Sequence, residues 1–199
     1  MTEIPIERHP WQPFLPAGAR VLMLGSFPPL RHRWSMDFFY PNFQNDMWRI
    51  IGLLFFSDRE YFTDDAHKHF DRQRCVKFCT EHGIALYDTA TAVRRLKENA
   101  ADKFLDVVEP TDIASLLRQI PKCQTVVVTG EKAAETVLLS LGKHALSYPK
   151  VGDYIKFDFE ERVMWLWRMP SSSRAYPLAL EKKAAHYDRM FREVGILKR

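Results

Sequence analysis

Residues 21–29, Val-Leu-Met-Leu-Gly-Ser-Phe-Pro-Pro, constrain the fold more than any other segment of this chain. The apolar run is uninterrupted up to Gly25, which is typical of a strand buried on both faces of a parallel sheet. Two prolines follow, and they exclude both a helix and a continued central strand at that point. The backbone must therefore turn sharply at the carboxyl end of a buried strand, where open α/β sheets bind their ligands.

A second segment, residues 38–48, reads Phe-Phe-Tyr-Pro-Asn-Phe-Gln-Asn-Asp-Met-Trp. Its rings supply stacking faces and its asparagines supply amide groups, a combination that suits a planar, polar ligand such as a nucleobase. The same residues also fit a plainer interpretation. Phe39 and Tyr40 would then be core aromatics, and Asn45 would cap a helix without taking part in any chemistry.

Strand-like and helix-like segments alternate along the rest of the chain. Strands are predicted at residues 20–25, 84–88, 125–130, 154–159 and 163–168, and helices at residues 45–56, 64–82, 111–118, 131–141 and 177–194. Thr111 and Pro177 are the expected first residues of their helices. With 199 residues and no linker-like stretch, the chain is predicted to form one domain over residues 1–199. The predicted fold class is α/β, a three-layer α/β/α sandwich with a short, mostly parallel central sheet.

Parallel topology places the ends of four predicted strands on one edge of the sheet. These ends are Gly25-Ser26, Tyr87-Asp88, Thr129-Gly130 and Met169-Pro170-Ser171. Asp88 is their only carboxylate, so it either orients water and stabilises a cation or caps the turn through nearby backbone N–H groups. The chain has no GxGxxG, GxxxxGK[ST] or GxSxG motif, which leaves dinucleotide-binding, P-loop and serine-hydrolase sites without support.

The composition narrows the class of protein further. A net charge of +4 permits contact with nucleic acid through a local patch but does not require it. The three cysteines have no CxxC spacing and the seven histidines form no metal-ligand pattern, so we expect neither a disulfide framework nor a metal site. The histidines are interpreted as surface or structural residues. No apolar run is long enough to span a membrane, and residues 1–16 lack a signal pattern, which predicts a cytoplasmic protein.

Several motifs, taken in order, resemble those of the uracil-DNA glycosylase superfamily, and within it the hypoxanthine-DNA glycosylase branch. They are Gly25-Ser26-Phe27-Pro28-Pro29, the aromatic and asparagine segment that ends at Trp48, the strand that ends at Asp88, the turn at residues 129–133, and Pro170-Ser171-Ser172-Ser173. The resemblance implies a monofunctional glycosylase of base-excision repair. Such an enzyme hydrolyses the N-glycosidic bond of deaminated bases, uracil or hypoxanthine, flipped out of DNA. DNA would be its partner and it would need no cofactor, because water is the only co-substrate.

The resemblance also implies roles for individual residues. Asn45 would be the catalytic or water-positioning amide, and Asp88, at the end of its strand, is the second catalytic candidate. The base would contact Ser26, Phe27, Tyr40 and Thr129, with the Tyr40 ring stacked on it. DNA would contact Pro170, Ser171, Ser172, Ser173 and Arg174, where serine hydroxyl and backbone N–H groups close to a helix start favour phosphate.

Four positions depart from the family motifs. Phe27 stands where many members carry a polar Asn or Asp, Pro29 where glycine is usual, Phe43 where proline is common, and Met47 in place of an aromatic residue. Two other interpretations therefore stay open. One is a nucleoside or nucleotide hydrolase that uses the same sheet edge for small molecules, and the other is a nucleic-acid-binding relative without catalytic activity.

Overall fold

A five-stranded mixed sheet forms the centre of the molecule. The computed structural model describes residues 4–64, 66, 68–97, 104–143 and 145–198. The strand order is β5-β2-β8-β10-β9, formed by β5 (Ile84–Asp88), β2 (Val21–Gly25), β8 (Thr125–Thr129), β10 (Arg162–Met169) and β9 (Asp153–Phe159). The first four strands run parallel, and β9 pairs with β10 in the antiparallel direction. The fold is therefore α/β with a mixed central sheet, and all five predicted strands are present in it.

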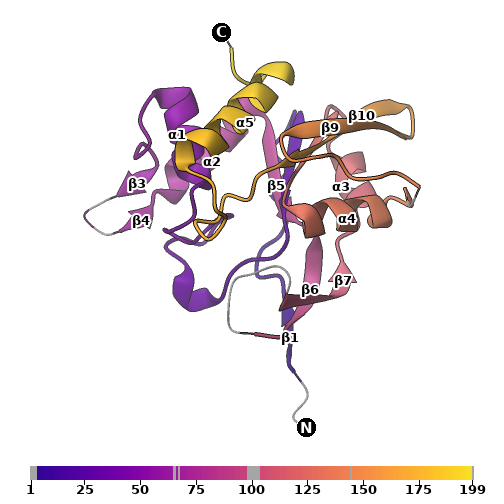
Figure 1. The fold of residues 1–199 in the computed structure, drawn as a ribbon, viewed down its shortest axis with the longest axis horizontal. Coiled ribbons are helices and arrows are strands. Elements are labelled where there is room, and N and C mark those ends of the chain that lie inside the picture. Colours follow the sequence, from indigo (N-terminus) through magenta and orange to yellow (C-terminus); the bar gives the residue numbers. More distant parts are fainter. Residues whose placement is uncertain (1–3, 65, 67, 98–103, 144, 199) are drawn as a thin grey trace.

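Helices cover both faces of this sheet (Figure 1). On one face lie α1 (Met47–Phe56), α2 (Arg72–His82) and α5 (Leu180–Glu193). The Phe55 ring joins these three helices, because it contacts Phe78 of α2 and Phe191 of α5. On the other face lie α3 (Ile113–Gln119) and α4 (Glu131–Ser140), which contact each other. None of the described helices is long and apolar enough to cross a membrane.

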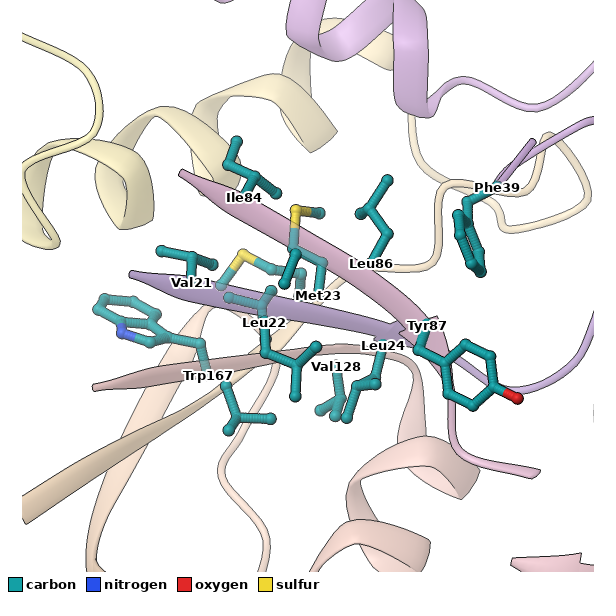
Figure 2. Close-up of a cluster of buried hydrophobic side chains, with 14 of the residues drawn as sticks. Val21, Leu22, Met23, Leu24, Phe39, Ile84, Leu86, Tyr87, Val128 and Trp167 are labelled. Atoms are coloured by element: carbon teal, nitrogen blue, oxygen red, sulfur yellow. The ribbon is translucent and has the colours of Figure 1, made fainter. Parts of the chain in front are cut away.

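The central strands supply the hydrophobic core because they are apolar on both faces. Residues 21–24 of β2 are fully buried, as are Val128 of β8 and Trp167 of β10. Figure 2 shows their side chains projecting alternately to the two sides of the sheet, toward the helical layers. Burial on both sides explains why the sequence of β2 has no polar alternation. At the carboxyl ends of β2 and β5 the core includes Phe39 and Tyr87 (Figure 2).

A second sheet has no counterpart in the sequence prediction. It is antiparallel with the order β1-β6-β7 and consists of β1 (Ile6–Arg8), β6 (Ala90–Arg95) and β7 (Leu105–Pro110). Only Thr89 separates β6 from the end of β5, so this small sheet lies beside the carboxyl edge of the central sheet. Phe27 packs against its hydrophobic cluster, which contains Ala90, Val93 and Leu105.

The helix predicted over residues 64–82 is wrong in its first part. There β3 (Thr63–Asp64) and β4 (His69–Phe70) pair antiparallel, and α2 starts only at Arg72. Two interactions set this boundary. Phe70 is buried in the core, and the Asp71 side chain accepts a hydrogen bond from the Arg74 backbone N–H at 3.0 Å, which caps the first turn.

Three other helices start two or three residues later than predicted, at Met47, Ile113 and Leu180. Asp112, not Thr111, caps α3 by accepting a hydrogen bond from the Ser115 backbone N–H at 2.9 Å. Pro177 lies ahead of α5 rather than in its first turn. The serines at 171–173 therefore do not directly precede α5, the helix that follows them in the chain.

Candidate active site

A cavity of about 120 Å³ lies at the carboxyl edge of the central sheet. Gly25 of β2, Asp88 of β5 and Thr129 of β8 line it, and the loop after β10 contributes Ser171. The four predicted strand ends thus meet around one space, as expected for parallel strands. Its volume is well below the ~300–1,000 Å³ of sites for drug-sized ligands, which suits a single small ring.

Most of the candidate residues line this cavity: Ser26, Phe27, Tyr40, Asn45, Asp88, Thr129, Ser171, Ser172 and Ser173. Pro170 and Arg174 are not part of its lining. Pro170 is buried, and its carbonyl accepts a hydrogen bond from the Tyr187 hydroxyl at 3.1 Å. Arg174 points its Nε at Asp46, 3.1 Å from Oδ1, while about half of its side chain stays exposed.

The turn after β2 passes very close to Asp88. A Cβ atom added to Gly25 would overlap Asp88 Oδ1, so glycine alone permits this approach. Asp88 Oδ2 lies 2.9 Å from Nε2 of His9, and only 12% of the Asp88 side chain is exposed. The Thr89 backbone N–H donates to the Gly25 carbonyl at 2.9 Å, which fixes the two strand ends relative to each other.

Tyr40 has an unusual backbone conformation at the cavity wall. Its φ of 53° lies in the left-handed region, which residues with a side chain seldom adopt. Its hydroxyl is buried and has no hydrogen bond of good geometry within the described part of the chain. Burial and, next, the Asp88 carboxylate raise the pKa of Tyr40 well above its usual value, while Thr129 lowers it to a smaller extent. The phenol at the cavity wall is therefore neutral.

Asn45 lies two residues ahead of α1. Its Oδ1 accepts a hydrogen bond from the Met47 backbone N–H at 2.9 Å, which is an Asx turn at the helix start. Its backbone also pairs with Ser173 in an isolated antiparallel bridge. With the oxygen engaged at the helix, the amide N–H groups are the polar atoms that Asn45 presents to the cavity it lines. Asn45 therefore makes a helix-start contact and also lines the cavity.

Further lining residues come from outside the motifs, namely Trp11, Arg95 and Leu105. Arg95 of β6 donates to both carboxylate oxygens of Glu7, Nε to Oε1 and Nη2 to Oε2, each at 3.0 Å. Its Nη2 also donates to the Pro28 carbonyl at 3.0 Å, which ties the first motif to the small sheet. No local pattern in the sequence marks these residues, because the small sheet brings them to the cavity by long-range pairing.

Within the described residues, no group of three or more His, Cys, Asp or Glu side chains could hold a metal ion. Cys75, Cys79 and Cys123 are buried free thiols. Burial raises the pKa of the Cys123 thiol to about 11. His67 and His144 lie outside the described residues.

Comparison with known proteins agrees with this architecture. The solution NMR structure of a proposed uracil DNA glycosylase from Methanosarcina acetivorans matches this chain with a TM-score of 0.63 and 22% sequence identity. The match covers 96% of this chain and 99% of that one. The two chains share one fold. No family model matches the chain, and neither does any curated protein.

Proposed function

We propose that this protein is a monofunctional DNA glycosylase that removes a deaminated base, uracil or hypoxanthine, from DNA in base-excision repair. One observation carries the proposal. The aromatic ring of Tyr40, the amide of Asn45 and the carboxylate of Asp88 all line the same small cavity. The fold shared with a proposed uracil DNA glycosylase supports the same conclusion. A base flipped out of the duplex would enter this cavity and stack on the Tyr40 ring.

The reaction requires charge stabilisation at two places. As the N-glycosidic bond breaks, its electron pair goes to the leaving base and positive charge grows on the sugar. The Asn45 amide and backbone N–H groups at Ser26 and Phe27 would stabilise the base, which is already a fairly good leaving group. Asp88 would stabilise the sugar cation and orient the water whose oxygen bonds to C1′. The water loses one proton as it bonds to C1′ and the departing base anion gains one, so the products are the free base and an abasic sugar.

DNA contact is assigned to the exposed part of the loop after β10. The Ser173 backbone N–H donates to Ser171 Oγ, and the Ala175 backbone N–H donates to Ser173 Oγ, both at 3.2 Å. Ser172 is buried, as is Pro170. We therefore assign phosphate contact to Ser171, Ser173 and the half-exposed Arg174, while Pro170 and Ser172 hold the loop in place.

The test uses labelled duplexes with one uracil, hypoxanthine or xanthine, followed by alkali cleavage of the abasic product. Wild type should yield product from uracil or hypoxanthine. Asn45→Asp keeps the oxygen that accepts from the Met47 N–H but loses the amide donors, so its single-turnover rate should fall ~10²–10³-fold. Gln44→Ala changes the exposed neighbouring residue and should leave the rate unchanged.

Two results contradict the proposal. If no lesion yields product while DNA binding is intact, the protein is a nucleic-acid-binding relative without catalytic activity, and Phe27 at the first-motif position accounts for the loss. If free nucleosides are hydrolysed faster than any lesion in DNA, the cavity belongs to a small-molecule hydrolase.

A further inference from the structure

We propose that His9 is a positioning residue for Asp88: it binds Oδ2 of the carboxylate and thereby keeps Oδ1 and the negative charge at the cavity. This role rests on the proposed function, because it places Asp88 on the sugar side of the glycosylase reaction. His9 follows β1 and belongs to none of the motifs.

His9 is held at both ring nitrogens. Its Nε2 lies 2.9 Å from Asp88 Oδ2, and only 2% of its side chain is exposed. Its Nδ1 lies 2.9 Å from the Trp11 carbonyl oxygen and 3.2 Å from the Trp11 backbone nitrogen. The His9 backbone N–H donates to the Thr91 carbonyl of β6 at 2.8 Å. These contacts fix both the ring and the backbone that carries it.

Aromatic rings enclose the imidazole. The ring centroids of Tyr87, Phe27, Trp11 and Phe39 lie 4.6, 5.6, 5.9 and 6.2 Å from that of His9. A hydrogen bond to a carboxylate is stronger in such surroundings than in water. Phe27 of the first motif packs edge-on against the histidine that binds the carboxylate, so the turn after β2 also helps to enclose the His9–Asp88 pair.

The second carboxylate oxygen of Asp88, Oδ1, lies beside Gly25 at the cavity lining. The Asp88 backbone carbonyl accepts a hydrogen bond from the Thr111 hydroxyl at 2.7 Å. With Oδ2 bound to His9 and the backbone fixed by Thr111, the carboxylate cannot rotate without losing its hydrogen bond to the imidazole.

The Trp11 peptide groups suit both protonation states of His9. A neutral ring with its proton on Nε2 accepts at Nδ1 from the Trp11 N–H, whereas an imidazolium donates at Nδ1 to the Trp11 carbonyl. In both states Nε2 donates to Asp88.

The test compares His9→Gln and His9→Phe with wild type at saturating lesion DNA. The His9→Phe variant keeps a ring in the aromatic enclosure but loses the N–H donor to Asp88. The loss of one hydrogen bond to a charged group should lower the single-turnover rate about 10- to 100-fold. DNA affinity should not change. Gln keeps an N–H donor near the position of Nε2 without an ionisable ring. Its rate should therefore stay close to that of wild type.

Two comparisons separate positioning from general support of the fold. His82 is a matched control, because its ring stacks on Phe78 with centroids 4.2 Å apart, yet it lies at the end of α2 away from the cavity lining. His82→Phe should keep the wild-type rate. In an Asp88→Asn background, His9→Phe should cause little further loss, because the two residues act through one interaction. A wild-type rate for His9→Phe, or an equally large loss in the Asp88→Asn background, overturns the proposal.

A readout independent of activity distinguishes this role from the proposed function. Nitrogen NMR of wild type should show the neutral His9 ring protonated on Nε2, with a resonance that shifts in Asp88→Asn. A proton on Nδ1 instead overturns the positioning role even if bases are excised. An Nε2 proton in a wild-type protein that excises no base supports the pair and rejects the proposed function.

Discussion

Lys183 of α5 forms a buried ion pair with Asp46, the residue directly ahead of α1. Nζ lies 2.9 Å from Asp46 Oδ2, and 1% of the lysine side chain is exposed. The same ammonium donates to the Ser173 carbonyl at 2.8 Å, and the Asp46 backbone N–H donates to the Ser172 carbonyl at 2.9 Å. One buried cation therefore joins α5 to the segment that carries Asn45 and to the serine loop.

Lys183→Met should destabilise the protein strongly. It leaves Asp46 buried with Arg174 as its remaining cation, and removal of one partner from a buried ion pair costs about 3–5 kcal/mol. Urea unfolding at neutral pH measures the change. Lys182→Met, at an exposed position of the same helix, should change the free energy of unfolding by less than about 0.5 kcal/mol. Equal free energies of unfolding for Lys183→Met and Lys182→Met would mean that the Lys183–Asp46 ion pair contributes nothing to stability.

Gly25→Ala should lower both the excision rate and the free energy of unfolding. The new Cβ would overlap Asp88 Oδ1, and since His9 holds Oδ2 the carboxylate can move only by losing that bond. A misplacement of this kind costs about 10²-fold in rate, and the strain costs about 1–3 kcal/mol of stability. Single-turnover kinetics measure the change in rate, and urea unfolding measures the change in stability.

The control for Gly25→Ala is the same substitution in an Asp88→Ala background. There the carboxylate is gone, so the added methyl group should have almost no effect on the free energy of unfolding. A stability loss that persists in this background would place the clash elsewhere than at Asp88.

The protein should lose stability as the pH rises above about 9–10. Burial, and next the Asp88 charge, raise the pKa of Tyr40 well above the usual value of 10.0, and burial raises the pKa of the Cys123 thiol from 9.0 to about 11. The unfolded chain then releases protons that the folded protein keeps, which favours unfolding. Each such group lowers the free energy of unfolding by up to about 1.4 kcal/mol per pH unit. An unfolded tyrosine is only half deprotonated at pH 10, so Tyr40→Phe should make the decline between pH 10 and 11 shallower by about 1 kcal/mol, as measured by urea unfolding; parallel curves would contradict it.

Arg174→Ala should weaken DNA binding and reduce its salt dependence. If the half-exposed guanidinium contacts one phosphate, the slope of log affinity against log salt should fall by about 1. Arg118→Ala is the matched control. That arginine is exposed and pairs with Glu160, next to the amino-terminal start of β10 and opposite the cavity edge, so its loss should leave the slope unchanged. An unchanged slope for Arg174→Ala would mean that Arg174 contacts no phosphate and serves only in its ion pair with Asp46.

The parts of the fold that depend on local pattern could be predicted from the sequence. Residues 84–88 form a strand with the predicted bounds, because a strand buried on both faces is apolar throughout. The place of the cavity followed from the same pattern, since the carboxyl ends of parallel strands share one edge. The start of α2 could not be predicted in this way. It depends on the burial of Phe70, which is a consequence of tertiary packing, and on the local cap that Asp71 then provides.

His9 shows where sequence reasoning reaches its limit. It is one of seven histidines, and no local pattern distinguishes it from the others. Its partner Asp88 lies 79 residues away along the chain. Only the pairing of β1 with β6 brings the two side chains together, and that small sheet has no strong periodic signal in the sequence.

The lining of the cavity runs from Trp11 to Ser173, and the lysine that holds the serine loop is at position 183. No shorter contiguous fragment between these residues contains the whole site. During synthesis on the ribosome, the complete cavity therefore exists only once α5 has been made and has packed against α1. A prematurely terminated chain that lacks α5 has no Lys183 to hold the loop after β10, so the cavity is completed in a late step.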